Sequence, residues 1–178
     1  MIPWFVATKP FTPAEGEAWE QYIDWSGLTQ LDEVISLDPL LCPPLLQAVQ
    51  DSSFWPHIVP ENFMLNCFLD LEFLKQHIVH IRPRNLLCVF RNPDKRPTAP
   101  SVDFEFIGYD LVDVQSVASA LTNCGGFPKA FANSELSRHG LLPDLERALE
   151  VQRLLRSAYP DEPRANCHLW AIFRAVEL

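Results

Sequence analysis

Three segments of strand length, dense in apolar residues, constrain the fold of this chain more than any other feature. They are Asn85–Arg91, Val102–Leu111 and Cys167–Val176. The first is an uninterrupted apolar run, which is typical of a strand covered on both faces, and the other two alternate apolar side chains between two faces. These segments do not alternate regularly with helices, so the sequence favours an antiparallel sheet over a doubly wound parallel one. The first two are expected to form a hairpin with a long loop.

Three further segments carry helix signals. The first runs from Pro13 to Trp25, preceded by Thr12 as the N-cap and followed by Gly27, which can adopt the left-handed conformation that ends a helix. The second covers residues 69–78, and the third covers residues 143–159 with acidic residues early and arginines late, as the helix dipole prefers. Each has apolar residues at helical spacing on one side.

The remaining segments give weaker signals. Short helices are expected at residues 133–140 and in a segment that ends at Val49, whereas Asp51–Pro60 is expected to be a loop packed by its aromatic residues. Residues 31–46 fit either a strand or a short helix. We therefore predict a single α+β domain over residues 1–178, with an antiparallel sheet of about three to five strands flanked by three or four helices.

The charge balance limits the classes of partner. Fourteen basic residues against 23 acidic ones give a formal net charge of −9. Binding to nucleic acid depends on Lys and Arg that displace counterions, and the only basic clusters are Arg82-Pro83-Arg84 and Asp94-Lys95-Arg96. The sequence therefore argues against nucleic acid and against anionic membranes as partners, and favours a basic protein.

Cysteine usage indicates a reducing environment. The chain has five cysteines, an odd number, and no pair has the two-residue spacing of a zinc knuckle or a redox motif. Several lie in apolar runs, where a reduced cysteine behaves as a small hydrophobic residue. No signal peptide is expected at the start of the chain. We expect a cytoplasmic protein that needs no cofactor and no metal.

The segment around Cys124 is the strongest candidate for catalysis. Cys124 precedes Gly125 and Gly126, so it could lie on a sharp turn whose backbone N–H groups form an oxyanion hole. His139 or His168 could act as the base. The alternative is a buried thiol beside a turn in which the glycines supply positive φ angles. The candidate catalytic residues are therefore Cys124, His168 and His139.

Four residues are candidates for binding or for orienting a base: Asp110, Asp113, Asn123 and Phe127. Paired carboxylates at a strand end can perform acid–base chemistry or hold a hard cation, but aspartates in this position more often cap the following turn. His77 and His80 could share a helix face, but two ligands do not make a metal site. No glycine-rich phosphate loop is present.

Three segments carry a resemblance to other proteins. Phe106–Asp113 (containing GYDLVD), Ala120–Pro128 (containing LTNCGGFP) and Ala165–Arg174 (ANCHLWAIFR) resemble segments of a group of uncharacterised bacterial proteins. This resemblance covers about the C-terminal half and implies no activity. In size and acidity alone, the chain also resembles the small cytoplasmic immunity proteins that neutralise toxins.

Three functions remain open at this point. The leading expectation is a non-enzymatic module, of the immunity-like kind, whose acidic surface binds a basic protein. The alternative is a small cysteine-dependent hydrolase centred on Cys124. A third reading is a homodimer whose aromatic residues form the interface, so both a monomer and a homodimer are open.

Overall fold

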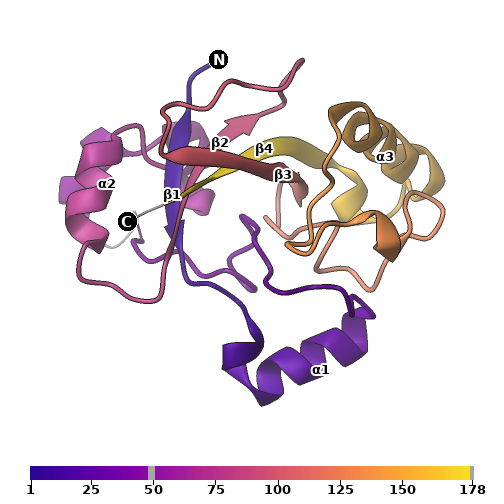
Figure 1. Cartoon of the computed structure of the whole chain (residues 1–178). Helices are drawn as coiled ribbons and strands as arrows, with labels where there is room; N and C mark the ends of the chain where they lie inside the picture. The colour runs from indigo at the N-terminus through magenta and orange to yellow at the C-terminus, as the bar shows by residue number, and fades with distance from the viewer. Residues whose placement is uncertain (48–50, 177–178) are drawn as a thin grey trace.

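Four antiparallel strands form one sheet in the computed structural model, which describes residues 1–47 and 51–176. The strands are β1 (Trp4–Thr8), β2 (Asn85–Arg91), β3 (Phe104–Asp113) and β4 (Cys167–Ala175), in the order β1-β2-β4-β3 (Figure 1). Because three α-helices accompany this sheet, the prediction of an α+β fold with an antiparallel sheet is confirmed.

The predicted hairpin is wrong, because β4 lies between β2 and β3. The prediction assumed that strands adjacent in sequence also pair. However, the connection at residues 92–103 is long enough to let the chain skip a position, and β4 competes better for the centre of the sheet. Its residues from Leu169 to Phe173 are all buried, as are those of β2 from Asn85 to Phe90. Strands that are apolar on both faces are stabilised most in the interior of the sheet.

Strand β1 was not predicted from the sequence. It is short, and Pro3 and Pro10 restrict the chain close to both ends. Its outer edge is covered, since the Leu45 N–H donates to the Ala7 carbonyl (2.8 Å) and Phe5 forms a β-bridge with Phe68. Covering an edge in this way satisfies backbone groups that could otherwise pair with another chain.

The three α-helices match the predicted helical segments with shifted starts. They are α1 (Glu17–Ser26), α2 (Leu71–Ile78) and α3 (Leu145–Ala158). Thr12 caps a separate 3-10 turn, and Gly16, at φ 61°, divides this turn from α1. Gly27 ends α1 in the left-handed conformation as predicted. Asp70 and Asp144 cap α2 and α3 by accepting backbone N–H groups in the first turn.

Shorter elements differ more from the predictions. Residues 133–140 form only a 3-10 turn at Asn133–Glu135, and the predicted loop at 51–60 contains a 3-10 helix, Ser52–His57. Residues 31–46 hold isolated β-bridges rather than a strand or a helix. No helix reaches Gln47, and the rest of the helix predicted to end at Val49 lies outside the described residues. None of the helices in the described part of the chain is both long and apolar enough to span a membrane.

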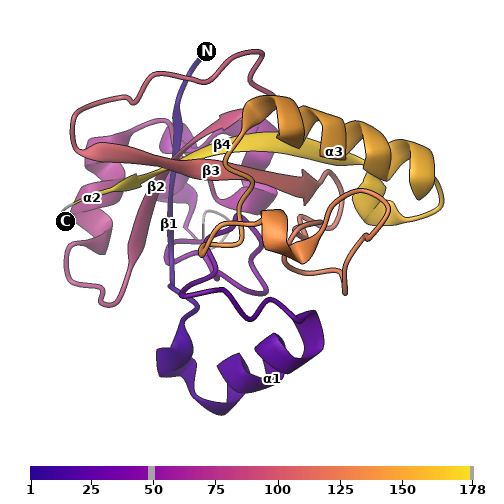
Figure 2. The ribbon, with the colours of Figure 1, turned by 45° about the vertical axis from the view of Figure 1, so that its right-hand side comes forward.

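The sheet separates two apolar clusters. On one face, α2 and α3 pack against residues such as Cys88 and Phe173. On the other face, connecting segments supply residues such as Ile35 and Val59 to a second cluster around Ile172. Helix α1 extends away from the sheet and rests on connecting segments, as both views show (Figures 1 and 2).

Candidate functional site

The thiol of Cys124 is enclosed by backbone groups. Its Sγ donates to the Ala120 carbonyl at 2.9 Å and accepts from the Gly126 N–H at 3.2 Å. Gly125 and Gly126 have φ angles of 71° and 93°, so they supply the positive φ angles that the sequence predicted for this turn. Burial raises the pKa of Cys124, which keeps the thiol protonated at neutral pH. The Gly126 N–H that an oxyanion hole would need is bound to the sulfur itself.

The two candidate bases lie elsewhere. His168, on β4, forms a hydrogen bond with the side chain of Asn92 at 3.0 Å. His139 lies near Arg174, and burial, together with the charge of Arg174, lowers the pKa of His139. Neither histidine forms a hydrogen bond with Cys124 within residues 1–47 and 51–176. Each of the three candidate catalytic residues therefore has its own surroundings, and the structure does not bring them together.

Asp110 and Asn123 belong to a buried polar network. Asp110 is fully buried and accepts hydrogen bonds from the hydroxyl groups of Ser36 and Ser119 and from the Leu111 N–H. Burial raises the pKa of Asp110 to about 6, although these hydrogen bonds oppose the shift.

A second buried carboxylate, Asp38, completes this network. It accepts hydrogen bonds from the Asn123 side chain at 2.7 Å and from the Ser119 N–H at 2.9 Å. Every hydrogen-bond donor to Asp38 and Asp110 in the described residues is neutral, and the network ties three connecting segments to β3. Its place inside the molecule gives this network a structural role.

The other two candidate residues have local roles. The Asp113 carboxylate accepts from the N–H groups of Gln115 and Ser116, so it caps the turn after β3, the more common role for an aspartate in this position. Phe127 is buried and packs edge-on against Tyr159, with ring centroids 4.9 Å apart. No group of three or more potential metal ligands occurs in the part of the chain that the structure describes.

Helix α1 carries a functional candidate that the sequence analysis missed. Glu17, Glu20 and Asp24 are all exposed and lie at i, i+3 and i+7, so they form one stripe along the helix. Trp25 borders this stripe with 55% of its surface exposed, and its ring lies beside the backbone at Gly125. The spacing of the three acidic residues, set against the apolar side of the same helix, could have indicated this surface.

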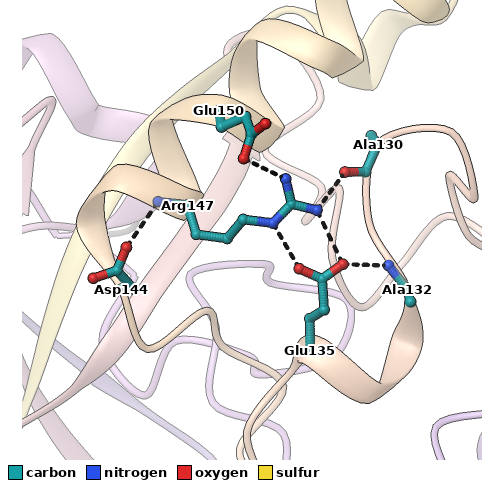
Figure 3. Close-up of polar contacts among 6 residues, drawn as sticks. All are labelled: Ala130, Ala132, Glu135, Asp144, Arg147 and Glu150. Atoms are coloured by element: carbon teal, nitrogen blue, oxygen red, sulfur yellow. Dashed lines mark hydrogen bonds and ion pairs between the residues drawn. The ribbon is translucent and has the colours of Figure 1, made fainter.

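The three carboxylates of this stripe form no ion pair within the described residues. Seven ion pairs elsewhere in the described residues join an acid to arginine or lysine. The densest case is Arg147, which binds Glu135 and Glu150 and also donates to the Ala130 carbonyl (Figure 3). On α1, by contrast, no basic residue is present to compensate the acids. The surface of α1 is therefore a site of uncompensated negative charge.

Comparison with known proteins adds no functional assignment. No protein-family model, no curated protein sequence and no solved structure matches this chain.

Proposed function

We propose that this chain is a non-enzymatic protein-binding module whose acidic α1 surface binds a basic segment of a partner protein. The α1 surface is defined by Glu17, Glu20, Asp24 and Trp25. The observation that carries the proposal is the stripe of three exposed carboxylates, which have no cationic partner among residues 1–47 and 51–176, beside a half-exposed tryptophan.

The position of Asp24 supports a role beyond helix stability. A negative charge in the last turn of a helix interacts unfavourably with the partial negative charge of the helix C-terminus, at a cost of about 0.3–1 kcal/mol. Helix α1 has Asp24 there and no basic residue in its last turn. In α3, by contrast, Arg156 occupies the last turn and complements the dipole. A carboxylate that weakens its own helix is consistent with selection for contact with another molecule.

Trp25 gives the α1 surface an apolar anchor. Exposed tryptophans are enriched among the residues that contribute most to protein–protein affinity, since they bury a large area on binding. The ring lies against Gly125 and near Tyr22, with centroids 6.1 Å apart, so it is held in place before a partner binds. Carboxylates around such an anchor attract a basic partner and raise the rate of association.

An immunity-like inhibitor, which covers the basic binding site of a toxin, is one kind of protein that uses such a surface. We propose this role for the chain as the specific form of its binding function, in the cytoplasm. All five cysteines are free and four of them are buried, which suits a reducing compartment.

The test compares two double charge reversals that change the net charge equally. Glu20→Lys with Asp24→Lys alters the α1 surface, and Asp94→Lys with Asp103→Lys alters the connection at residues 92–103, on the opposite side of the molecule (Figure 1). A lysine-rich peptide is titrated into each ¹⁵N-labelled protein while backbone signals and tryptophan indole signals are followed by NMR.

We expect the peptide to shift signals of α1 and of Trp25 in the unaltered protein and in the 94/103 variant, and to lose this effect in the 20/24 variant. Rising salt should weaken the shifts, because exposed charges are screened. Affinity capture from cells that express the chain naturally should return a basic protein that only the 20/24 variant loses. Equal losses in both variants would show that net charge alone drives binding, and the proposal would then fail.

A further inference from the structure

A cavity of about 240 Å³ lies where β2 ends and β4 begins. Arg91, His168 and Trp170 form its floor: Arg91 pairs with Trp170 across the sheet, and His168 lies two positions from Trp170 on the same face. The 3-10 segment Pro60–Leu65 and the turn after β3 form the other walls. At roughly 30 Å³ per water molecule the volume equals that of about eight waters, which suits a small metabolite and not a peptide.

Two of the floor residues offer buried or half-buried hydrogen-bond donors. Trp170 is 1% exposed, and its Nε1–H has no acceptor among the described residues. A buried donor without an acceptor destabilises the folded state, so a ligand that supplied an acceptor would recover this energy. Arg91 lies over the Trp4 ring at 5.0 Å and donates from Nη2 to Glu61 at 2.8 Å. Its guanidinium group has further N–H donors in a fixed plane.

The third floor residue, His168, is also a donor. The Leu169 N–H donates to Asn92 Oδ1 at 3.0 Å, which fixes the orientation of this amide and places its NH₂ group against His168 Nδ1. An amide NH₂ group only donates, so Nδ1 accepts and the proton of the neutral ring lies on Nε2. Burial, together with Arg91 and Arg156, lowers the pKa of His168 and keeps the ring neutral at pH 7.

The protein carboxylates beside the cavity do not use up the N–H donors of its floor. The Asp113 carboxylate already binds two backbone N–H groups of its own turn. Among the described residues, Glu61 is the carboxylate bound to Arg91, but its side chain is 68% exposed. An ion pair with so exposed a carboxylate contributes little to stability, so a carboxylate from a ligand can displace it.

The remaining lining is apolar. Val112, Val117, Met64 and Leu65 line the space beside Trp170. Walls of this kind favour a ligand with a short branched hydrocarbon body, because burying its surface releases water from both partners.

We propose that this cavity binds a small organic carboxylate with a short branched apolar body, and that the ligand carboxylate replaces Glu61 on Arg91 and accepts from the ring N–H groups of His168 and Trp170. The site is separate from the α1 surface, so ligand binding and protein binding can be tested independently.

The indole N–H signal of Trp170 provides a direct readout. The chain has five tryptophans, and the Trp170→Phe variant identifies the signal of interest by its loss. The probes are 4-methylpentanoate, L-leucine, which adds an amino group to the same body, and 4-methylpentanamide, which lacks the negative charge. We expect the carboxylates to move the Trp170 signal downfield and to saturate it at millimolar concentration, and the amide to leave it unchanged.

Two variants and a control decide which contacts hold the ligand. Arg91→Lys removes the planar fork and should weaken carboxylate binding about tenfold. Glu61→Gln removes the competing carboxylate and should strengthen binding several-fold. Arg96→Lys is the matched control, because Arg96 also lies over an aromatic ring, that of Phe106, but outside this cavity, and binding should not change.

The outcomes separate clearly. Tighter binding of L-leucine than of 4-methylpentanoate identifies an amino acid as the ligand, and the reverse order identifies a simple acid, so either order supports a carboxylate site. The proposal is overturned if no carboxylate moves the Trp170 signal, if the amide binds equally well, or if Glu61→Gln weakens the binding of 4-methylpentanoate.

Discussion

Asp110 is a fully buried carboxylate whose hydrogen-bond donors are all neutral, and its protonation should therefore affect stability. Burial raises its pKa to about 6 in the folded state, against about 3.9 in an unfolded chain. Between these values the folded state binds the proton and the unfolded state does not. The contribution of Asp110 to stability should thus fall as the pH rises from about 4 to about 6 and change little above that.

The Asp110→Asn variant isolates this effect. Asparagine cannot titrate, so the variant should lose a pH-dependent change in stability on the order of 3 kcal/mol across this range. Urea denaturation of both proteins at several pH values measures the difference. Asp94→Asn is the control, since Asp94 is exposed and forms no ion pair with the residues that the structure describes, and it should keep the slope of the unaltered protein. Parallel pH profiles for Asp110→Asn and the unaltered protein would contradict the assignment.

Cys124 is the residue on which the hydrolase alternative depends. Because burial raises its pKa, the thiolate fraction at neutral pH should be small, and iodoacetamide should react with Cys124 more slowly than with free glutathione. Mass spectrometry of the folded protein over time measures this rate, and the same reaction in urea shows that the thiol is chemically competent. If iodoacetamide reacted with Cys124 faster than with glutathione, the result would instead support Cys124 as the nucleophile of a hydrolase.

At the scale of elements, the bulge in β3 depends on one glycine. Gly108 has a φ angle of 143°, and an added Cβ would lie 2.7 Å from the Leu141 Cβ and 3.0 Å from the Leu142 carbonyl oxygen. Gly108→Ala should therefore lower the free energy of unfolding by on the order of 3 kcal/mol, through backbone strain and overpacking.

The matched control for this prediction is Gly27→Ala. Gly27 also has a positive φ angle, 68°, but the nearest atom to an added Cβ is the Asn133 Nδ2 at an ordinary 3.5 Å. Gly27→Ala should therefore lower the free energy of unfolding by about 1 kcal/mol, because alanine is disfavoured in the left-handed conformation. Thermal or urea unfolding compares the two variants, and equal losses would show that the contact with Leu141 is unimportant.

Elements with local signals were the ones that the sequence predicted well. Asp70 and Asp144 mark helix starts because their side chains bind backbone groups only a few residues away. The same holds for Gly27 at the end of α1. Strand β1 was missed because five residues between two prolines carry little periodicity, and its stability comes from pairing with β2, far along the chain.

At the scale of the whole molecule, neither the order of the strands nor the meeting of distant side chains could be predicted from the sequence. Both depend on contacts between distant positions: Ser36 binds Asp110 across 74 positions, and no local pattern encodes this pair. Residue types alone suggest Cys124, His139 and His168 as a catalytic set, but residue types do not say whether distant side chains meet. Only the fold shows that these three residues lie in separate surroundings. The α1 surface was predictable in principle, because its spacing is local, whereas the cavity at Arg91 required the register of β2 against β4.

The central position of β4 also bears on how the protein is made. Because synthesis runs in the N-terminal to C-terminal direction, β1, β2 and β3 leave the ribosome while the place between β2 and β3 is still vacant. Until residue 175 has emerged, the inner edges of β2 and β3 have no partner, and the nascent chain exposes two apolar strand edges at once. The sheet can therefore be completed only after its other three strands have been made, and a chaperone that holds exposed strands would protect the chain from aggregation in that interval.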